Sequence, residues 1–294
     1  MLRFGLDLGG TKIEGAVLDQ RGRVLFRERI PTEQKKGYRA ILGNLARLYN
    51  SMKTAAQNRP HTLGIGTPGT LSSKTGKLKN SNTLCLNGRL SLAELKRVFR
   101  RPLTLENDAN CFALAEALLG AGRGQARVFG VILGTGCGGG IVEGGRLLRG
   151  RQGLAGEWGH MAIDPYGPRC YCGSRGCVET LISGGGLEKK YRRLYGHSLQ
   201  LTGIVEGFRR GEPRAKSIMK IFFKDFGRAM ANLIHILDPD IVVLGGGVSN
   251  VRELYTQGLR QTRCRIFGGE SGTPIVKNRL GDSAGVLGAA LLGV

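Results

Sequence analysis

One glycine-rich segment occurs twice in this chain of 294 residues, and the repeat limits the possible folds more than any other feature. GLDLGGTKIEGAVL begins at Gly5, and GVILGTGCGGGIV begins at Gly130. Gly5 matches Gly130 and Gly15 matches Gly140, at one offset of 125 positions. Each copy has two apolar runs joined by glycines, which predicts a β-hairpin. A hairpin at the head of each half predicts a duplicated α/β architecture.

Hydrophobic spacing predicts the other elements. The first half should contain strands at 3–8, 13–19, 23–30, 62–66 and 102–108, and helices at 38–58, 91–99 and 109–122. Ser91 and Glu94 form a capping-box pattern at the start of the second helix. The second half should contain a helix at 216–239, a buried strand at 240–247 and a closing helix at 281–294. We therefore predict two α/β domains, residues 1–119 and 120–294.

Charge and hydropathy restrict the classes of function. The formal net charge is +22, which raises nucleic acid as a partner. The basic residues are scattered, however, so solvation of the surface or an anionic ligand such as a nucleotide accounts for them equally well, and we expect no nucleic-acid partner. No apolar run approaches the roughly 18 residues of a membrane span. The start MLRFGLDLGG has no signal-peptide pattern, and we expect a cytoplasmic protein without a membrane partner.

Three glycine turns follow predicted strands and suit a nucleotide. Small residues, backbone N–H groups and a hydroxyl at a strand end can cradle phosphate. The turn LGGG, after a buried strand, offers a wall for a ring or a ribose, although it could equally be a tight strand-to-helix connection. Asp7 could hold Mg²⁺ through water, or could simply cap a turn. The candidate nucleotide-binding residues are Asp7, Gly9, Gly10, Thr11, Lys12, Gly134, Thr135, Gly136, Gly245, Gly246 and Gly247.

Glu106, Asn107 and Asp108 place three polar side chains at a predicted strand-to-helix junction. Asn107 or Asp108 could serve only as the N-cap of the helix. A carboxylate at this position could instead accept a proton from a hydroxyl nucleophile, with Asn107 bonded to a neighbouring hydroxyl. Both interpretations remain open from the residues alone.

One histidine and three cysteines occur close together, at His160, Cys170, Cys172 and Cys177. In a reducing compartment this density favours a metal over disulfides. Because Glu157 and Glu179 flank the cluster, the site could be a structural clip, a catalytic centre or a clip that positions substrate ligands.

The motifs together resemble the ROK family of bacterial sugar kinases and repressors, over essentially the whole chain. The resemblance rests on DLGGTK, GIGTPG, ENDAN, LGTGCGGGI, AGEWGH, CYCGSRGCVE and LDPDIVVLGGG, in this order. The segments NSNTLCLNG, CYCG, ETLISG, GGVSNV and FGGESGTP look most similar to fructokinase-type members. N-acetylglucosamine kinases come next, and glucokinases of the family are a further alternative.

The resemblance implies an actin-like ATPase fold, with two α/β domains around a cleft. It implies ATP and Mg²⁺, a hexose acceptor and a homodimer. Fructose would be phosphorylated on its 6-hydroxyl. Asp108 would be the general base. The implied sugar-binding residues are Gly66, Pro68, Gly69, Asn82, Asn107, Asp108, Glu157, His160 and Glu179.

Within this framework, the His–Cys cluster fits a structural Zn²⁺, because one histidine and three cysteines close a four-coordinate shell. The metal would place Glu157 and Glu179 against the sugar, with the second ring nitrogen of His160 facing a hydroxyl. A ROK-type regulator is the main alternative from another class. Such regulators carry a helix-turn-helix ahead of DLGGTK. We expect no helix-turn-helix here, because only Met1–Leu6 precede Asp7. A sugar-binding protein without catalysis is a third alternative, which the intact Asp108 and both glycine loops disfavour.

Overall fold

The computed structural model describes residues 1–72, 74–81, 83–269 and 272–293, and the chain divides into two compact units. Unit 1 comprises Met1–Gly120, Arg146–Leu154 and the segment from Leu280 onward, and unit 2 comprises Ala121–Gly145 and Ala155–Arg279. This division differs from the predicted domains 1–119 and 120–294, because the C-terminal segment packs with the N-terminal half. Within the described ranges, no helix is long and apolar enough to cross a membrane.

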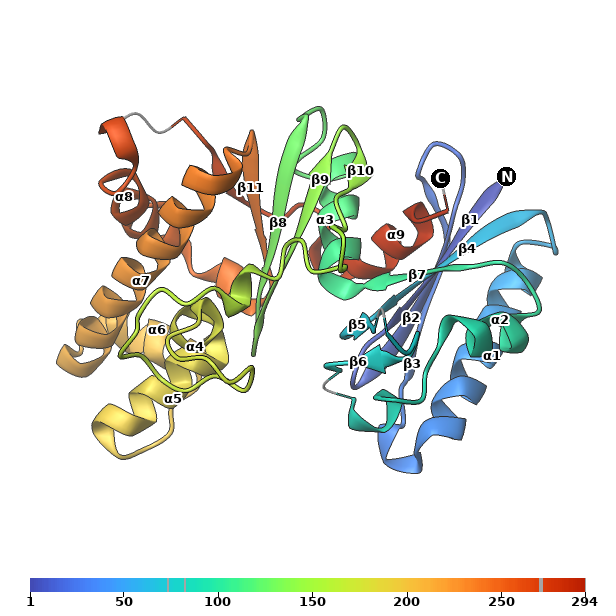
Figure 1. Ribbon diagram of the computed structural model, residues 1–294, viewed down its shortest axis with the longest axis horizontal. Helices are drawn as coiled ribbons and strands as arrows, with labels where there is room; N and C mark the ends of the chain where they lie inside the picture. Colours follow the sequence, from blue (N-terminus) through green and yellow to red (C-terminus); the bar gives the residue numbers. More distant parts are fainter. Residues whose placement is uncertain (73, 82, 270–271, 294) are drawn as a thin grey trace. The chain divides into compact units, whose positions relative to one another are not determined.

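Unit 1 is built on a five-stranded sheet with helices on its faces (Figure 1). The strand order is β3-β2-β1-β4-β7, with β1 antiparallel to β2 and parallel to β4. Its strands are β1 (Leu2–Leu8), β2 (Lys12–Leu18), β3 (Val24–Pro31), β4 (His61–Thr67) and β7 (Thr104–Asn107), with a small ladder of β5 (Thr70–Leu71) and β6 (Leu78–Lys79). Its helices are α1 (Tyr38–Ala55), α2 (Leu92–Phe99), α3 (Asp108–Leu118) and α9 (Ala284–Leu291).

Unit 2 repeats the same sheet topology, in the order β10-β9-β8-β11-β12. Of these strands, unit 2 contains β8 (Arg127–Leu133), β9 (Cys137–Glu143), β11 (Ile241–Gly245) and β12 (Ile275–Lys277), whereas β10 (Arg146–Leu147) follows β9 in the chain and belongs to the residues grouped with unit 1. Its helices are α4 (Val178–Ile182), α5 (Gly184–Tyr195), α6 (Leu201–Arg210), α7 (Pro213–Leu237) and α8 (Gln257–Arg263). The apolar stripe of α7, which includes Phe222, Phe226 and Met230, is fully buried in the core of this unit.

The predicted duplication is confirmed strand by strand. Adding the offset of 125 positions to the bounds of β1 and β2 gives the bounds of β8 and β9. Both hairpins are antiparallel, and the first strand of each pairs in parallel with a later strand, β4 in unit 1 and β11 in unit 2. Each glycine turn therefore lies at the same place in its own sheet, at the carboxyl end of the first strand.

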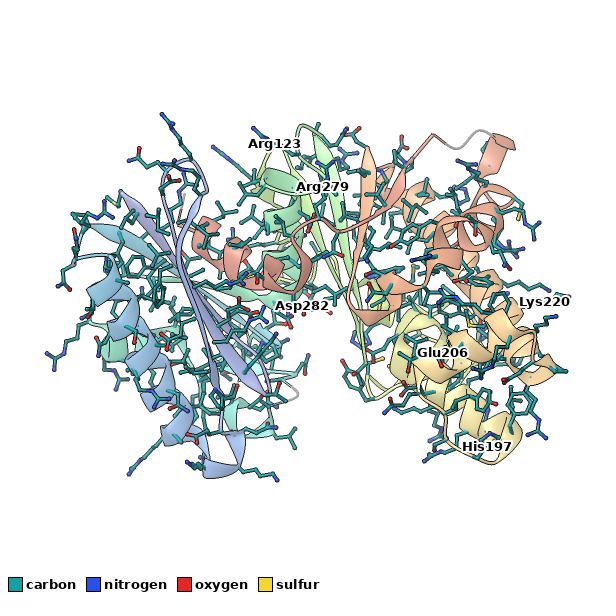
Figure 2. The ribbon with its side chains drawn as sticks, turned by 180° about the vertical axis from the view of Figure 1, so that it is seen from behind. Arg123, His197, Glu206, Lys220, Arg279 and Asp282 are labelled. Carbon is teal, nitrogen blue, oxygen red and sulfur yellow. The ribbon has the colours of Figure 1, made fainter. Side chains whose placement is uncertain are left out.

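The local signal at Ser91 predicts the start of α2 correctly. The Ser91 hydroxyl accepts a hydrogen bond from the Glu94 backbone N–H at 3.2 Å, as expected of an N-cap. The Glu94 carboxylate accepts a hydrogen bond from the Tyr38 hydroxyl, which links α2 to α1. Basic side chains such as Arg123 and Lys220 are exposed and point outward (Figure 2), consistent with scattered surface charge.

Glycines on β1 and β4, which have no side chain, let α9 lie directly on the sheet of unit 1. A Cβ added at Gly64 on β4 would come within 1.9 Å of the Ala289 carbonyl oxygen of α9. A Cβ added at Gly5 on β1 would come within 2.3 Å of the Val286 carbonyl oxygen. Gly15 on β2 faces the other side, where α1 packs against it through Leu48. The glycines of the repeat therefore serve packing as well as turns.

We expect Gly64→Ala to destabilise the protein by about 3 kcal/mol, because the added methyl group must displace the backbone of α9. Urea or thermal unfolding of the purified variant measures this change. Gly43→Ala is the matched control, because Gly43 is exposed on α1 with nothing within 4 Å of an added Cβ. That control should stabilise the helix by up to about 1 kcal/mol. Equal stability of the two variants would contradict the packing argument.

Candidate functional site

In unit 1, three charged residues form a row across the hairpin and its neighbouring strand. Asp7 of β1 pairs with Glu14 of β2, and Glu14 pairs with Arg29 of β3. Arg29 Nε lies 2.7 Å from a Glu14 carboxylate oxygen, and the Glu14 side chain is almost fully buried. Ser283, just before α9, donates a hydrogen bond of 3.0 Å to Glu14. The C-terminal segment is thus tied to the strand pair beside Asp7.

The environment of Asp7 raises the pKa of its carboxyl group to about 7. Burial is the largest cause, and the negative charges of Asp108 and Glu14 add to it, while Lys12 and Arg29 act in the opposite direction. Added Cβ atoms at Gly66 and Gly285 would come within 3.4 Å and 2.6 Å of Asp7 carboxylate oxygens. A carboxylate held this way near a second one is suited to bind a cation, which offsets the repulsion.

The strand-to-helix junction uses Asn107, not Asp108, as the N-cap of α3. The Asn107 side-chain oxygen accepts a hydrogen bond of 2.8 Å from the Ala109 backbone N–H, and its amide donates one of 3.1 Å to the Gly69 carbonyl. Asp108 is the first residue of the helix and is only partly buried, and its carboxylate accepts a 2.8 Å bond from the Ala109 N–H. The capping role therefore falls to Asn107, and Asp108 lies beside it in the first turn of α3.

Sequence reasoning did not find Arg149, although it belongs to this group of side chains. Arg149 Nε lies 2.6 Å from a Glu106 carboxylate oxygen, and the other Glu106 oxygen accepts 3.0 Å bonds from the Asn107 backbone N–H and the Asn110 amide. Arg149 follows the second hairpin, whereas Glu106 precedes α3. Only their assembly in unit 1 brings them together, and no local motif marks the pair.

In unit 2, the glycine turn of the second hairpin lies against helices α4 and α5. The Gly134 carbonyl accepts a 2.8 Å hydrogen bond from the Gly184 N–H at the start of α5. Glu179 on α4 accepts a 2.9 Å bond from the Cys137 N–H, which follows the turn. A Cβ at Gly246, after β11, would come within 2.4 Å of the Leu133 carbonyl oxygen. The predicted phosphate turn and the predicted adenosine turn are therefore neighbours in this unit.

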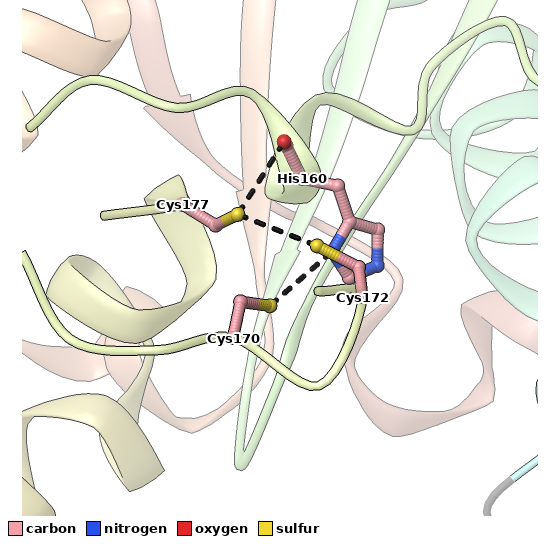
Figure 3. A group of neighbouring side chains, drawn as sticks. All are labelled: His160, Cys170, Cys172 and Cys177. Atoms are coloured by element: carbon pink, nitrogen blue, oxygen red, sulfur yellow. Dashed lines mark hydrogen bonds between the residues drawn. The ribbon is translucent and has the colours of Figure 1, made fainter. Parts of the chain in front are cut away.

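The predicted metal ligands meet at one point (Figure 3). One ligand atom from each of His160, Cys170, Cys172 and Cys177 lies within 4.8 Å of all the others. Cys170 Sγ is 3.7 Å from His160 Nδ1, and Cys172 Sγ is 3.6 Å from Cys177 Sγ. Ligands at Zn²⁺ bond lengths in a tetrahedron are separated by about 3.6–3.8 Å. The four side chains thus fit a tetrahedral metal ion.

The thiols of this cluster have unequal acidity. A hydrogen bond from the Ser174 backbone lowers the pKa of Cys172 to about 6, whereas burial raises the pKa of Cys177 to about 12. Burial also raises the pKa of Cys170. One thiolate is therefore available near neutral pH, and a metal ion would have to displace the protons of the other two thiols.

The second ring nitrogen of His160 faces a hydroxyl group of the chain itself. His160 Nε2 lies 3.0 Å from the Tyr171 hydroxyl, while Nδ1 faces the cysteines. Burial raises the pKa of Tyr171 to about 12, and the charges of Glu179 and Glu157 contribute to that shift. Both predicted flanking carboxylates therefore lie near the cluster, as expected from the sequence.

The predicted site residues are divided between the two units. Unit 1 contains Asp7, Gly9, Gly10, Thr11, Lys12, Gly66, Pro68, Gly69, Asn107 and Asp108. Unit 2 contains Gly134, Thr135, Gly136, Glu157, His160, Cys170, Cys172, Cys177, Glu179, Gly245, Gly246 and Gly247. Asn82 lies outside the described residues.

Comparisons with known proteins agree with this architecture. The ROK family model matches residues 3–293. N-acetyl-D-glucosamine kinase of Yersinia pseudotuberculosis is 37% identical over 299 residues, covering 98% of both chains. A ROK hexokinase from Thermus thermophilus has a TM-score of 0.89 at 37% identity, covering 99% of this chain and 97% of that one. A ROK family glucokinase from Streptomyces griseus, in complex with glucose and AMPPNP, has a TM-score of 0.79 at 30% identity, covering 100% and 99%.

We expect Asp7→Asn to stabilise the protein at pH 8 by about 1–3 kcal/mol in the absence of Mg²⁺ and nucleotide. The folded state holds the Asp7 proton more tightly than the unfolded state, so wild-type stability should fall as pH rises from about 4 to 7. The gain should therefore be smallest near pH 4 and should grow toward pH 8 in chemical unfolding curves.

Asp19→Asn is the control for this experiment, because the pKa of Asp19 is shifted in the opposite direction from that of Asp7. Hydrogen bonds from Arg23 lower the pKa of the half-buried Asp19, so its loss should not stabilise the protein at pH 8. If Asp7→Asn proves less stable than the wild type at pH 8, the ionised Asp7 carboxylate does not destabilise the folded protein, and the interpretation of its raised pKa is wrong.

Proposed function

The chain belongs to the ROK family and has the fold of its sugar kinases, and we propose that it transfers the γ-phosphate of ATP to N-acetyl-D-glucosamine. The observation that carries the kinase assignment is the pair of carboxylates in unit 1, Asp7 and Asp108, which are close enough to raise the pKa of Asp7. The choice of sugar follows the Yersinia relative. The sequence motifs favoured fructose, but the Yersinia and Streptomyces relatives are named for N-acetyl-D-glucosamine and glucose, so fructose has no support from those names.

We propose Asp108 as the general base for the sugar hydroxyl. Its place at the first turn of α3 supports this role, because the helix N-terminus stabilises the ionised carboxylate. Asn107, fixed by its bonds to the Ala109 N–H and the Gly69 carbonyl, would orient a neighbouring hydroxyl. Phosphoryl transfer depends mainly on positioning and charge stabilisation, so a partly exposed base held by a rigid helix end is sufficient.

We propose that Asp7 holds the Mg²⁺ that accompanies ATP, which supplies positive charge to the phosphates. The glycine turns of the two hairpins, at Gly9 and Gly134, would bind phosphate oxygens through backbone N–H groups. The turn at Gly245–Gly247 would hold the adenosine. The common position of both hairpin turns in duplicated sheets supports a shared role.

For the sugar, we propose hydroxyl contacts from Asn107, Glu157, His160 and Glu179, with Gly66, Pro68, Gly69 and Asn82 as further lining residues. The charges of Glu157 and Glu179 both act on Tyr171, which supports their place on one surface of unit 2. The Tyr171 hydroxyl faces His160 Nε2, the ring nitrogen that the sugar would use. We infer that this hydroxyl is displaced or shares the contact when sugar binds.

We propose that His160, Cys170, Cys172 and Cys177 hold one structural Zn²⁺. The spacing of their ligand atoms and their number, four, support a closed tetrahedral shell without a position for water. The metal would fix the segment after Glu157 and the start of α4 before Glu179. Its role is therefore to position sugar ligands, and no step of the transfer passes through it.

A coupled ADP-release assay over a panel of sugars tests the proposed function. N-acetyl-D-glucosamine should have the highest kcat/KM, with N-acetylgalactosamine, glucose, mannose and fructose as the comparison substrates. A higher kcat/KM for fructose would restore the substrate that the motifs favoured. The absence of ADP release with every sugar would contradict the kinase assignment itself.

We expect Asp108→Asn to lower kcat by about 100- to 10,000-fold, the usual cost of losing a general base. Sugar affinity, measured by calorimetry, should change by less than about tenfold, because the amide keeps the shape of the carboxylate. Asp19→Asn is again a suitable control, and its kcat should equal that of the wild type. Retention of more than about a tenth of the wild-type kcat would exclude Asp108 as the base.

Metal analysis by mass spectrometry should find about one zinc per chain in the purified protein. Cys172→Ala should lose the metal and should weaken sugar binding much more than ATP binding, because Glu157 and Glu179 flank the cluster whereas the glycine turns contribute no ligand to it. Cys264→Ala, at an exposed thiol outside the cluster, is the matched control and should keep metal and affinity. A zinc-free protein with full activity, or selective loss of ATP binding in Cys172→Ala, would be incompatible with this role.

A further inference from the structure

Unit 2 contains a cavity of about 230 Å³ beside the His–Cys cluster. The segment that precedes Cys172 lines one side of the cavity, and helices α4 and α5 line the other. Thr135, from the glycine turn of the second hairpin, also contributes to the lining. A cavity this size accommodates a small ligand rather than a segment of polymer.

The lining of this cavity has a large excess of positive charge. Its cations are Arg169, Lys189, Lys190 and Arg193, and its single carboxylate is Glu179. One oxygen of Glu179 accepts a hydrogen bond from the Cys137 N–H, at 2.9 Å. The excess is local, and it is distinct from the scattered surface charge of the rest of the chain.

One of the four cations has a partner within the protein. Lys190 Nζ lies 3.2 Å from a carboxylate oxygen of Asp225 on α7, and both side chains are nearly buried. Lys190 therefore helps to hold α5 on α7. In contrast, no ion pair within the described ranges involves Arg169, Lys189 or Arg193.

Two of these unpaired cations repel one another on the helix. Lys189 and Arg193 are four residues apart on α5 and so lie on the same face. The preceding residue, Glu188, is engaged by the Leu201 backbone N–H at 2.9 Å. An anion from solution would relieve this repulsion, which no described carboxylate of the helix does.

The donors around the cavity match phosphate chemistry. Two guanidinium groups and one ammonium group can each bind a different oxygen of a multiply charged anion. Tyr171 lies in the same lining, and its hydroxyl group can donate a further bond. A carboxylate ligand would use fewer of these donors, because it has only two oxygens.

We propose that this cavity is a binding site for a phosphate anion additional to the phosphates of ATP. The anion is either the sugar phosphate that the reaction forms or a short inorganic phosphate chain, since both present the same oxygens. The site is built by Lys189 and Arg193 of α5 together with Arg169. Where the sugar phosphate is the ligand, the proposal rests on the proposed function, and binding then acts as product feedback.

Isothermal titration calorimetry of the full chain, at constant ionic strength, tests the proposal. The titrants are tripolyphosphate and N-acetylglucosamine 6-phosphate, each with and without saturating AMPPNP, and sulfate serves as the control for general charge attraction. At least one phosphate titrant should bind more tightly than sulfate, and AMPPNP should not displace it. The double variant Lys189→Ala/Arg193→Ala should weaken that binding about tenfold or more, because each charged hydrogen bond contributes about 1.5–3 kcal/mol.

Arg192→Ala/Lys220→Ala is the matched control, because it removes two exposed charges that do not line the cavity. It should leave the dissociation constant within about twofold. Equal weakening in both double variants, binding no tighter than sulfate, or displacement by AMPPNP would each overturn the proposal. No turnover is needed, so an inactive kinase that still binds the anion at this cavity would refute the proposed function alone.

Discussion

The packing of α9 on the glycine face of the first sheet is the contact on which unit 1 depends. Gly5 and Gly64 have no side chains where α9 passes, so the backbones of helix and strand can touch. That close approach brings Gly285 against the Asp7 carboxylate and Ser283 against Glu14. A helix from the end of the chain thereby buries a carboxylate at the start of the chain. The raised pKa of Asp7 follows from this burial.

The row of Asp7, Glu14 and Arg29 explains how the fold tolerates such burial. Paired strands place their opposite residues on the same face, so the register alone sets these three side chains in line. Arg29 neutralises Glu14, and its charge also acts on Asp7. The remaining unfavourable charge is therefore concentrated at Asp7. The ionised form of Asp7 is unfavourable in the protein alone and would be stabilised by a bound cation. Destabilised groups of this kind are common at ligand sites.

Local patterns predicted the repeat, the main elements of the first half and the long helix and buried strand of the second, because hydrophobic period and glycine turns are encoded in short segments. They did not mark α4, α5, α6, α8 or β12. They also predicted the four residues of the His–Cys cluster, since those occur within 18 positions. The grouping of α9 with the first half, and the Arg149–Glu106 ion pair, join segments far apart in the sequence. No local pattern carries such information. The N-cap at Asn107 was only one of two options, because either polar side chain could serve until the backbone geometry was known.

One short segment of unit 2, residues 177–180, takes part in the His–Cys cluster, in the contact with the second glycine turn and in the cavity lining. Cys177 belongs to the His–Cys cluster and is also the N-cap residue of α4, and Glu179 in the first turn of that helix accepts the Cys137 N–H of the second hairpin. Thr180, one residue later, returns a hydrogen bond to the Cys177 carbonyl and lines the cationic cavity. Four consecutive residues therefore contact the cluster, the glycine turn and the cavity. Loosening the cluster should act first on Glu179 and on the cavity lining, because a helix of five residues has little length in which to absorb a displacement. The glycine turn is also held by α5, through the hydrogen bond from the Gly184 N–H to the Gly134 carbonyl.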